Sequence, residues 1–297
     1  MKYAFLVGVA LLLALSPVGA YGGTYSTDFS EASIDLLAPG VVTVQGDATA
    51  SISGGQFSLI DSTGLTLLQR NAFLVPPVGG TFPSGFDLTV VISASTIELM
   101  KTCPRAWSGI YLAGVSDSPW VFFGPCGQTP AGFMNYWLIP VAQQPAVASM
   151  MIAALRQGGN RIPWSAALPA SPSDTTLRVV VDGSTPQRAT FYVDGSPVTL
   201  RDELGNVIPY LTIGTGPVNR VGVGQWAAHL GLASPAITTT VDSLVLTGDE
   251  VPNYQFPPPP PIPGVTAVSY SGLAVLALAM IGLALFFVRG KRQAART

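Results

Sequence analysis

Two Asp-Gly pairs, Asp182-Gly183 and Asp194-Gly195, each follow a run of β-favouring residues within the segment Leu177–Val198. Asp and Gly both tolerate the positive φ that a two-residue hairpin turn demands. The pairs therefore predict strand, turn, strand, with Asp182 and Asp194 as turn residues first. A chemical role for either carboxylate is the alternative.

The same rhythm of short β-rich runs extends from residue 24 to residue 250. Gly (32 residues) and Pro (26 residues) are frequent, which suits many turns between short strands. Besides the region around the Asp-Gly pairs, the runs are Phe86–Ile92, Trp107–Val115, Trp120–Phe123, Phe133–Ile139, Val221–Trp226 and Thr238–Leu246. Only Ala146–Arg156 has helical composition, and it fits a strand equally well. Because most runs follow one another without a helix between them, we predict an all-β antiparallel sandwich or barrel.

The N-terminal residues 1–20 have the composition of a secretory signal peptide. Lys2 is followed by the apolar run Phe5–Leu15 and by the small residues Val18-Gly19-Ala20. This order predicts export with cleavage after Ala20. An uncleaved membrane anchor is the alternative.

The C-terminal segment 265–288 contains 24 residues without a charge, whereas a bilayer core needs about 20. The basic tail 289–297 follows, and the positive-inside rule places it in the cytoplasm. We therefore predict an ectodomain over residues 21–250, a Pro-rich linker over 251–264 and one membrane helix. The predicted location is the cell surface, and a buried core helix is the alternative for 265–288.

The C-terminal region consists of Ile262-Pro263-Gly264, the apolar segment after it and a terminal Arg-rich cluster. This order resembles bacterial sorting signals of the PEP-CTERM and IPTL-CTERM types. It implies a sortase-like membrane enzyme that cuts before the helix. Neither Pro-Glu-Pro nor Ile-Pro-Thr-Leu is present, so a permanent anchor stays open.

The net charge of the exported part limits the classes of partner that suit it. The exported part holds nine Lys and Arg against 16 Asp and Glu, a formal charge of −7. This charge does not suit DNA or RNA as a partner.

The only cysteines of the exported part, Cys103 and Cys126, predict one disulfide after export, with two reduced thiols as the alternative. With His229 as the only histidine, a zinc site built on these cysteines lacks ligands.

Several short motifs lie along the chain: Thr27-Asp28-Phe29 near the start, FYVDG at 191–195, VGVGQW at 221–226 and TTTVDSLVLTG at 238–248. Together they resemble the concanavalin A-like lectin and glucanase group, which includes laminin-G-like and pentraxin-like jelly rolls. The resemblance covers most of residues 25–248. It implies an antiparallel jelly-roll sandwich in which the first and last strands pair.

The resemblance also implies which catalytic carboxylates an enzyme of this group would carry. The glucanases of this group carry E-x-D-x-x-E on one strand, which alternation places on one face. The glutamates of the exported part, Glu31, Glu98, Glu203 and Glu250, do not stand in that spacing. We therefore predict that the protein is not an enzyme, with an atypical glycoside hydrolase as the least favoured alternative.

Binding is the function that the resemblance favours. Aromatic side chains suit the apolar faces of sugar rings, so Trp107, Trp120 and Tyr136 are the candidate ligand-binding residues; the alternative is that they belong to the core. Related jelly rolls hold calcium through an Asp of the last strand, and Asp242 has a similar place. The predicted partner is a glycan or a cell-surface protein. A structural or adhesive protein without a small ligand is the alternative.

Overall fold

The computed structural model describes ten stretches of the chain, all in the first of two compact units, which spans residues 1–257. The stretches are 22–31, 43–45, 49–61, 69–103, 106–114, 120–127, 147–155, 161–214, 216–227 and 237–256. The predicted signal peptide and the segment 265–288 lie outside them. Among the described residues, no helix has the length and apolar character to cross a membrane.

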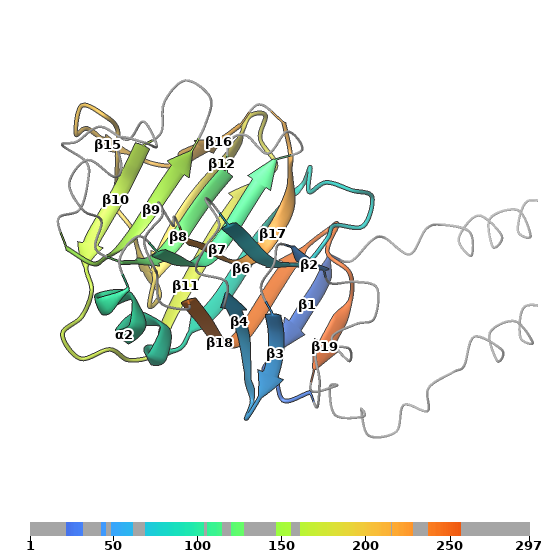
Figure 1. Ribbon diagram of the computed structural model, residues 1–297. Helices are drawn as coiled ribbons and strands as arrows, with labels where there is room; N and C mark the ends of the chain where they lie inside the picture. The colour runs from blue at the N-terminus through green and yellow to red at the C-terminus, as the bar shows by residue number, and fades with distance from the viewer. Residues whose placement is uncertain are drawn as a thin grey trace, which may run out of the picture. The chain divides into compact units, whose positions relative to one another are not determined.

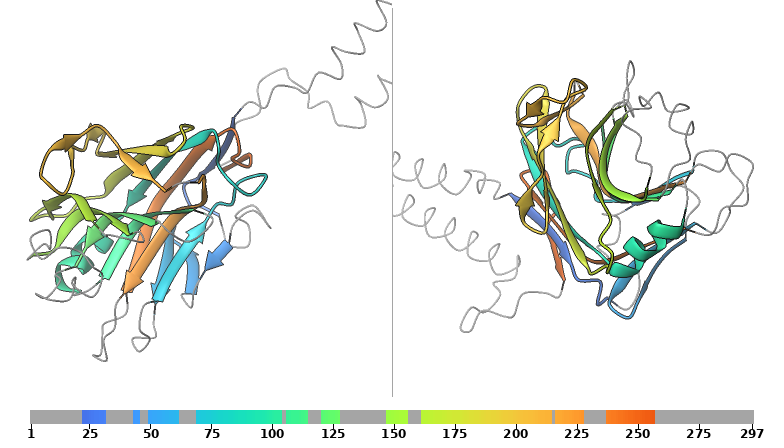
Figure 2. Two further views of the ribbon diagram at one scale, coloured as in Figure 1. Left: turned by 90° about the horizontal axis from the view of Figure 1, so that it is seen from above. Right: turned by 90° about the vertical axis from the view of Figure 1, so that its left-hand side faces the viewer.

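Two large β-sheets form the described part of the protein, and they pack face to face (Figures 1 and 2). The first, ten-stranded, follows the order β13 (Ser196–Pro197), β12 (Gln187–Val193), β11 (Thr175–Asp182), β6 (Gly85–Ile92), β18 (Ile237–Gly248), β1 (Gly23–Thr27) and β19 (Tyr254–Phe256), with β16 (Leu211–Ile213) beside β12, and β4 (Gln56–Asp61) and β3 (Thr49–Ser53) beyond β18. The second, seven-stranded, follows the order β10 (Arg161–Ala167), β9 (Ser149–Leu155), β8 (Trp120–Cys126), β7 (Ala106–Gly114), β17 (Val218–Ala227), β5 (Gln69–Leu74) and β2 (Thr43–Gln45). A small hairpin of β14 (Leu200–Arg201) and β15 (Val207–Ile208) stands apart. The predicted all-β antiparallel sandwich is confirmed.

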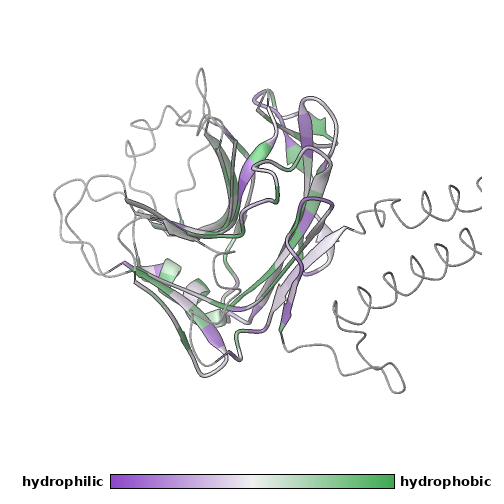
Figure 3. Ribbon diagram, turned by 90° about the vertical axis from the view of Figure 1, so that its right-hand side faces the viewer, coloured by the Kyte–Doolittle hydropathy of each residue, from purple (hydrophilic) through white to green (hydrophobic). Residues whose placement is uncertain are grey.

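The core lies between the two sheets because alternate residues of each strand point inward. In β11, Leu177, Val179 and Val181 are buried, and the residues between them are not. On the seven-stranded sheet, Ile110 and Phe123 belong to the same buried cluster. Hydrophobic residues accordingly run along the strands of both layers (Figure 3).

The pairing of the first strand with the last long strand is also confirmed. β1 lies antiparallel to β18, with Tyr25 opposite Leu246. The folded unit continues past residue 250, because Val251 is buried in the core and β19 pairs in parallel with β1. These residues fall within the segment predicted as linker.

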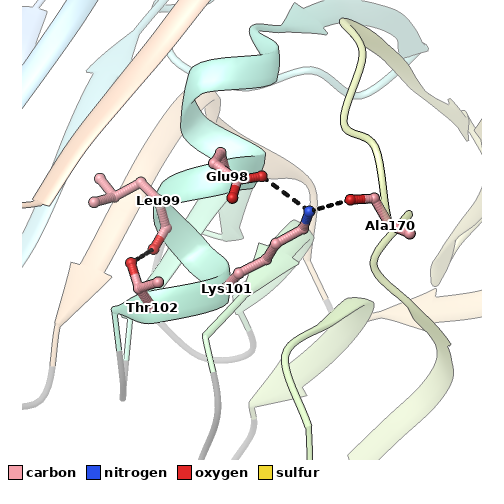
Figure 4. Close-up of polar contacts among 5 residues, drawn as sticks. All are labelled: Glu98, Leu99, Lys101, Thr102 and Ala170. Carbon is pink, nitrogen blue, oxygen red and sulfur yellow. Dashed lines mark hydrogen bonds and ion pairs between the residues drawn. The ribbon is translucent and has the colours of Figure 1, made fainter.

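The helix α2 (Ala94–Thr102) connects the two sheets and is not anticipated by the sequence pattern. Ser93 caps its N-terminus, and the Asp174 carboxylate accepts a hydrogen bond from the Ala94 N–H (2.9 Å). Lys101 Nζ donates to the Ala170 carbonyl oxygen (2.8 Å) and to Glu98 (2.9 Å; Figure 4). The helix thus holds the segment between β10 and β11. The stretch with helical composition, in contrast, forms the strand β9.

Both aspartates serve turns, but only Asp194-Gly195 forms the two-residue turn; Asp182 is the last residue of β11, and its carboxylate caps the four-residue connection 183–186 to β12. Asp194 and Gly195 have φ values of 48° and 76°, and the Asp194 carboxylate accepts from the Thr176 N–H (2.8 Å). Asp182 Oδ1 accepts hydrogen bonds from Ser184 and from the Arg188 N–H (3.1 Å). Burial raises the Asp182 pKa, but these hydrogen bonds outweigh it and lower the pKa overall.

The predicted disulfide between Cys103 and Cys126 is wrong, since no disulfide joins these two described residues. Each sulfur belongs to a different apolar cluster. Cys103 packs with Met100, Ala106 and Ile237 beneath α2, whereas Cys126 lies in a cluster on the seven-stranded sheet. Both side chains are buried, and Cys126 Sγ donates to the Gly127 carbonyl oxygen (3.3 Å).

Candidate ligand-binding face

The seven-stranded sheet carries a second apolar cluster on the face opposite the core. Its residues alternate with core residues along the same strands, and the sheet curves so that this face is concave (Figure 2). The cluster consists of Ala72, Leu74, Trp107, Tyr111, Ala113, Phe122, Cys126 and Met151. We call it the concave-face cluster.

Three aromatic rings from neighbouring strands dominate the concave-face cluster. The Trp107 Nε1–H of β7 donates to Met151 Sδ of β9 (3.0 Å). The rings of Tyr111 and Phe122 lie 5.3 Å apart at 42°. Opposite them, β17 has Gly224, where a Cβ atom would approach Tyr111 Cβ to 2.8 Å. A residue without a side chain at 224 therefore makes room for the rings.

Burial limits what these rings can contact. Trp107 is 2% exposed, and Tyr111 and Phe122 are each 3% exposed. A sugar can stack on them only if a rearrangement exposes the cluster. Of the other candidates, Trp120 is the first residue of β8 and Tyr136 lies outside the described residues.

Sequence reasoning identified Trp107 as a candidate but did not identify the residues that cluster with it. Tyr111 and Phe122 stand in the same aromatic-rich stretch, so their density was an available signal. Met151 and Gly224 come from strands distant in the sequence, and only the β8–β9 and β7–β17 pairings bring them to the cluster. No local signal marks them.

Asp242 lies elsewhere, at an irregularity in the pairing of β18 with β6, between Val241 and Ser243. Its Oδ1 accepts a hydrogen bond from Gln56 Nε2 (2.5 Å), and its Oδ2 is buried with no hydrogen-bond partner among the described residues. Burial raises the Asp242 pKa, the Gln56 hydrogen bond opposes this, and the charge of Asp174 raises it further.

Calcium would need more oxygens than this place supplies. The ion takes six to eight oxygen ligands. Asp242 offers one uncommitted carboxylate oxygen, and no three His, Cys, Asp or Glu side chains gather around a common point within the described stretches. The described residues do not by themselves fit a calcium ion. Calcium binding by this protein therefore rests on the resemblance and stays a prediction.

Three of the four glutamates considered for catalysis have separate structural partners. Glu31 is buried and accepts from Thr27 and Tyr254. Glu98 pairs with Lys101 on α2, and Glu250 Oε1 accepts from Ser84 Oγ (2.7 Å). Glu203 lies in the exposed turn between β14 and β15. His229 lies outside the described residues.

No family model matches the chain, and no curated protein matches it at a significant level. Several solved structures are similar. A protein of unknown function from Shewanella oneidensis MR-1 is 12% identical with a TM-score of 0.46, over 80% of this chain and 92% of that one. The carbohydrate recognition domain of Emp47p is 8% identical, with a TM-score of 0.43 over 75% and 95%. The GH43 protein BlXynB from Bacillus licheniformis is 10% identical, with a TM-score of 0.44 over 75% and 39%. Likeness of this degree transfers neither ligand nor activity to this chain.

Proposed function

We propose that this protein is a non-catalytic carbohydrate-binding module, exported and displayed at the cell surface on a C-terminal membrane helix. The observation that carries the binding proposal is the concave-face cluster. A sheet in a two-layer sandwich needs one apolar face to form the core. Here the same strands also place Trp107, Tyr111 and Phe122 on the opposite face.

The chemistry of these rings suits a sugar. Their faces are apolar and polarisable, and a pyranose presents C–H groups that pack on such faces. The formal charge of −7 on the exported part argues for a neutral ligand over a polyanion. The concanavalin-like sequence motifs support the same class of ligand.

A second function is favoured by the burial of the rings. If the concave-face cluster never opens, it is a second core, and the domain is a structural or adhesive surface protein without a small ligand. The exposure of at most 3% for the three rings supports this alternative. Glycan binding decides between the two.

The test is a glycan-array screen of the full-length chain, with calcium and then with chelator. We expect selective binding, and the bound glycan should raise the melting temperature because it binds only the folded state. A melting temperature that rises with calcium in the wild type but not in Asp242→Asn would support the predicted metal site.

A pair of adjacent residues provides the matched variants. Phe122→Leu alters the concave-face cluster, and Phe123→Leu alters the core face of the same strand. Both should lower the melting temperature, but only Phe122→Leu should weaken glycan binding, by about tenfold or more. That is about 1.4 kcal/mol, the scale of one aromatic contact.

Two outcomes of these experiments would redirect the proposal, and a separate measurement tests the processing of the chain. A blank array under both conditions would favour the structural or adhesive protein. Cleavage of β-glucans by the pure protein would revive the glycosidase alternative. Mass spectrometry of the protein recovered from membranes would show whether residues 1–20 are removed and whether a processing enzyme cuts before the segment 265–288.

A further inference from the structure

The hairpin of β3 and β4 ends the ten-stranded sheet beyond β18 and lies at the lower side of Figure 1. Its turn is Gly54-Gly55, with φ values of 62° and 77°, as in a two-residue type I′ turn. The register from Ser53–Gln56 to Thr49–Ile60 is unbroken. Among the described strands, β3 pairs only with β4.

β3 lacks the devices that usually protect a sheet edge. Protected edges are very short, or carry charge, proline or a bulge. The other described edge strands follow this rule: β2, β13, β16 and β19 have at most three residues, and β10 carries Pro163 and a register shift. β3 has five residues, Thr-Ala-Ser-Ile-Ser, with no charge, proline or bulge.

The hairpin geometry determines which backbone groups face outward. In a two-residue hairpin, the residues flanking the turn form a hydrogen-bonded pair, and such pairs alternate with non-hydrogen-bonded pairs along the ladder. Ser53, Ser51 and Thr49 therefore bond to β4. The N–H and C=O groups of Ala50 and Ile52 point to the free edge, while their side chains pack against the core.

This outward pattern is complementary to itself. When two β3 strands run antiparallel about a two-fold axis at Ser51, Ala50 of one copy faces Ile52 of the other. Both residues then use their outward groups in a hydrogen-bonded pair, and Ser51 faces Ser51 in a non-hydrogen-bonded pair. No charges meet across the axis because β3 has none. We propose that a second copy of this chain binds here, joining two ten-stranded sheets edge to edge in a symmetric dimer.

Cysteine substitution tests the register of this dimer in the full-length chain. In the proposed pairing the two Ser51 Cα atoms lie about 4.5 Å apart, within reach of a disulfide. Ser51→Cys should form a covalent dimer under mild oxidation. Thr49→Cys, on the same face of the same strand, should not, because it faces Ser53 of the other copy. The wild type, whose Cys103 and Cys126 are buried, should stay uncrosslinked.

A charge substitution tests the dimer without a crosslink. Light scattering on the full-length wild-type chain in detergent should give about twice the mass of one chain. Ser51→Lys sets two positive charges against each other at the axis and should return the mass to that of one chain. Ser26→Lys, at a half-buried position of the interior strand β1, should leave the dimer intact.

Three results would overturn the proposal. A monomeric wild type without a Ser51→Cys dimer would mean that the edge is unoccupied or binds an extended peptide of another protein. A wild-type dimer that survives Ser51→Lys would place the interface elsewhere. Equal crosslinking of Thr49→Cys and Ser51→Cys would contradict the register.

Discussion

Burial changes the chemistry of individual side chains, as at Asp242 and Cys103. Asp242 has one carboxylate oxygen bonded to Gln56, and the other is buried with no hydrogen-bond partner in the described part of the chain. Cys103 lies beneath α2, where burial raises the pKa of its thiol to about 11. In both cases the neutral form is favoured because a buried charge loses its hydration.

Asp242→Asn should stabilise the protein at neutral pH. The raised pKa of Asp242 means that the folded state binds a proton more tightly than the unfolded state, whose pKa is about 3.9. Stability is therefore lost as the pH rises from about 4 through the folded-state pKa. Asparagine cannot ionise but keeps an oxygen for Gln56. Urea unfolding at pH 4 and pH 7 should show a benefit at pH 7 only, and an equal benefit at both would contradict this.

Both cysteines should react as reduced thiols without prior reduction, but only after unfolding. The thiolate is the reactive form; burial raises the pKa of the Cys103 thiol and so suppresses it, and both side chains are buried away from the reagent in the native protein. Titration with a thiol reagent at pH 8 should label neither cysteine natively and both in guanidinium. If labelling in guanidinium required prior reduction, the result would instead support a disulfide between the two cysteines.

The short strand β19 is attached to the sheet through specific side-chain contacts. It has three residues and pairs in parallel with β1. The Tyr254 ring stacks on Tyr25 with centroids 5.1 Å apart, and its hydroxyl donates to the buried Glu31 carboxylate (2.9 Å). These contacts attach β19 to the sheet.

Removing the two tyrosine hydroxyls should have different effects. Tyr254→Phe takes a donor from a buried carboxylate and should cost about 1–3 kcal/mol. Tyr25→Phe removes a buried hydroxyl that has no hydrogen-bond partner and should cost little or stabilise. Urea unfolding of both variants measures the difference. Equal losses would show that ring packing, and not the Glu31 hydrogen bond, attaches β19.

At the scale of the whole molecule, polar contacts supplement the apolar core between the sheets. Ser108 of the seven-stranded sheet and Thr239 of the other form a buried hydrogen bond of 2.7 Å between their hydroxyls. The Gln225 side-chain amide lies 3.0 Å from the same Thr239 oxygen. After the last long strand, Val251 also packs into this core.

A chain that stops after Glu250 should be less stable than one that stops after Pro257. The shorter chain lacks Val251, which is 3% exposed, and all of β19. Burying one valine contributes about 1.5–3 kcal/mol, so the loss should be about 2 kcal/mol or more. Thermal unfolding of the two truncated chains measures it. Equal stability would place the end of the folded unit at residue 250.

Local patterns were sufficient for the architecture but not for the site. Alternation in β11 and the Asp-Gly turns predict strands and hairpins, because side-chain period and turn chemistry act within a few residues. The helix α2 has no such strong local pattern. Contacts with a distant segment hold it: Asp174 of that segment accepts from the helix N-terminus, and Lys101 of the helix donates to the Ala170 carbonyl. The concave-face cluster likewise needs β7, β8, β9 and β17 side by side.

The sequence by itself determined that the domain is an antiparallel β-sandwich and that an E-x-D-x-x-E triad is absent, whereas the pairing of β1 with β18 was implied only by the resemblance to concanavalin-like jelly rolls. Only the tertiary structure decided which aromatic rings share a face, that Cys103 and Cys126 occupy separate clusters, and which strands lie at an open edge. The physical reason is range. Strand and turn preferences arise between near neighbours, whereas faces, burial and edges depend on which distant strands pair.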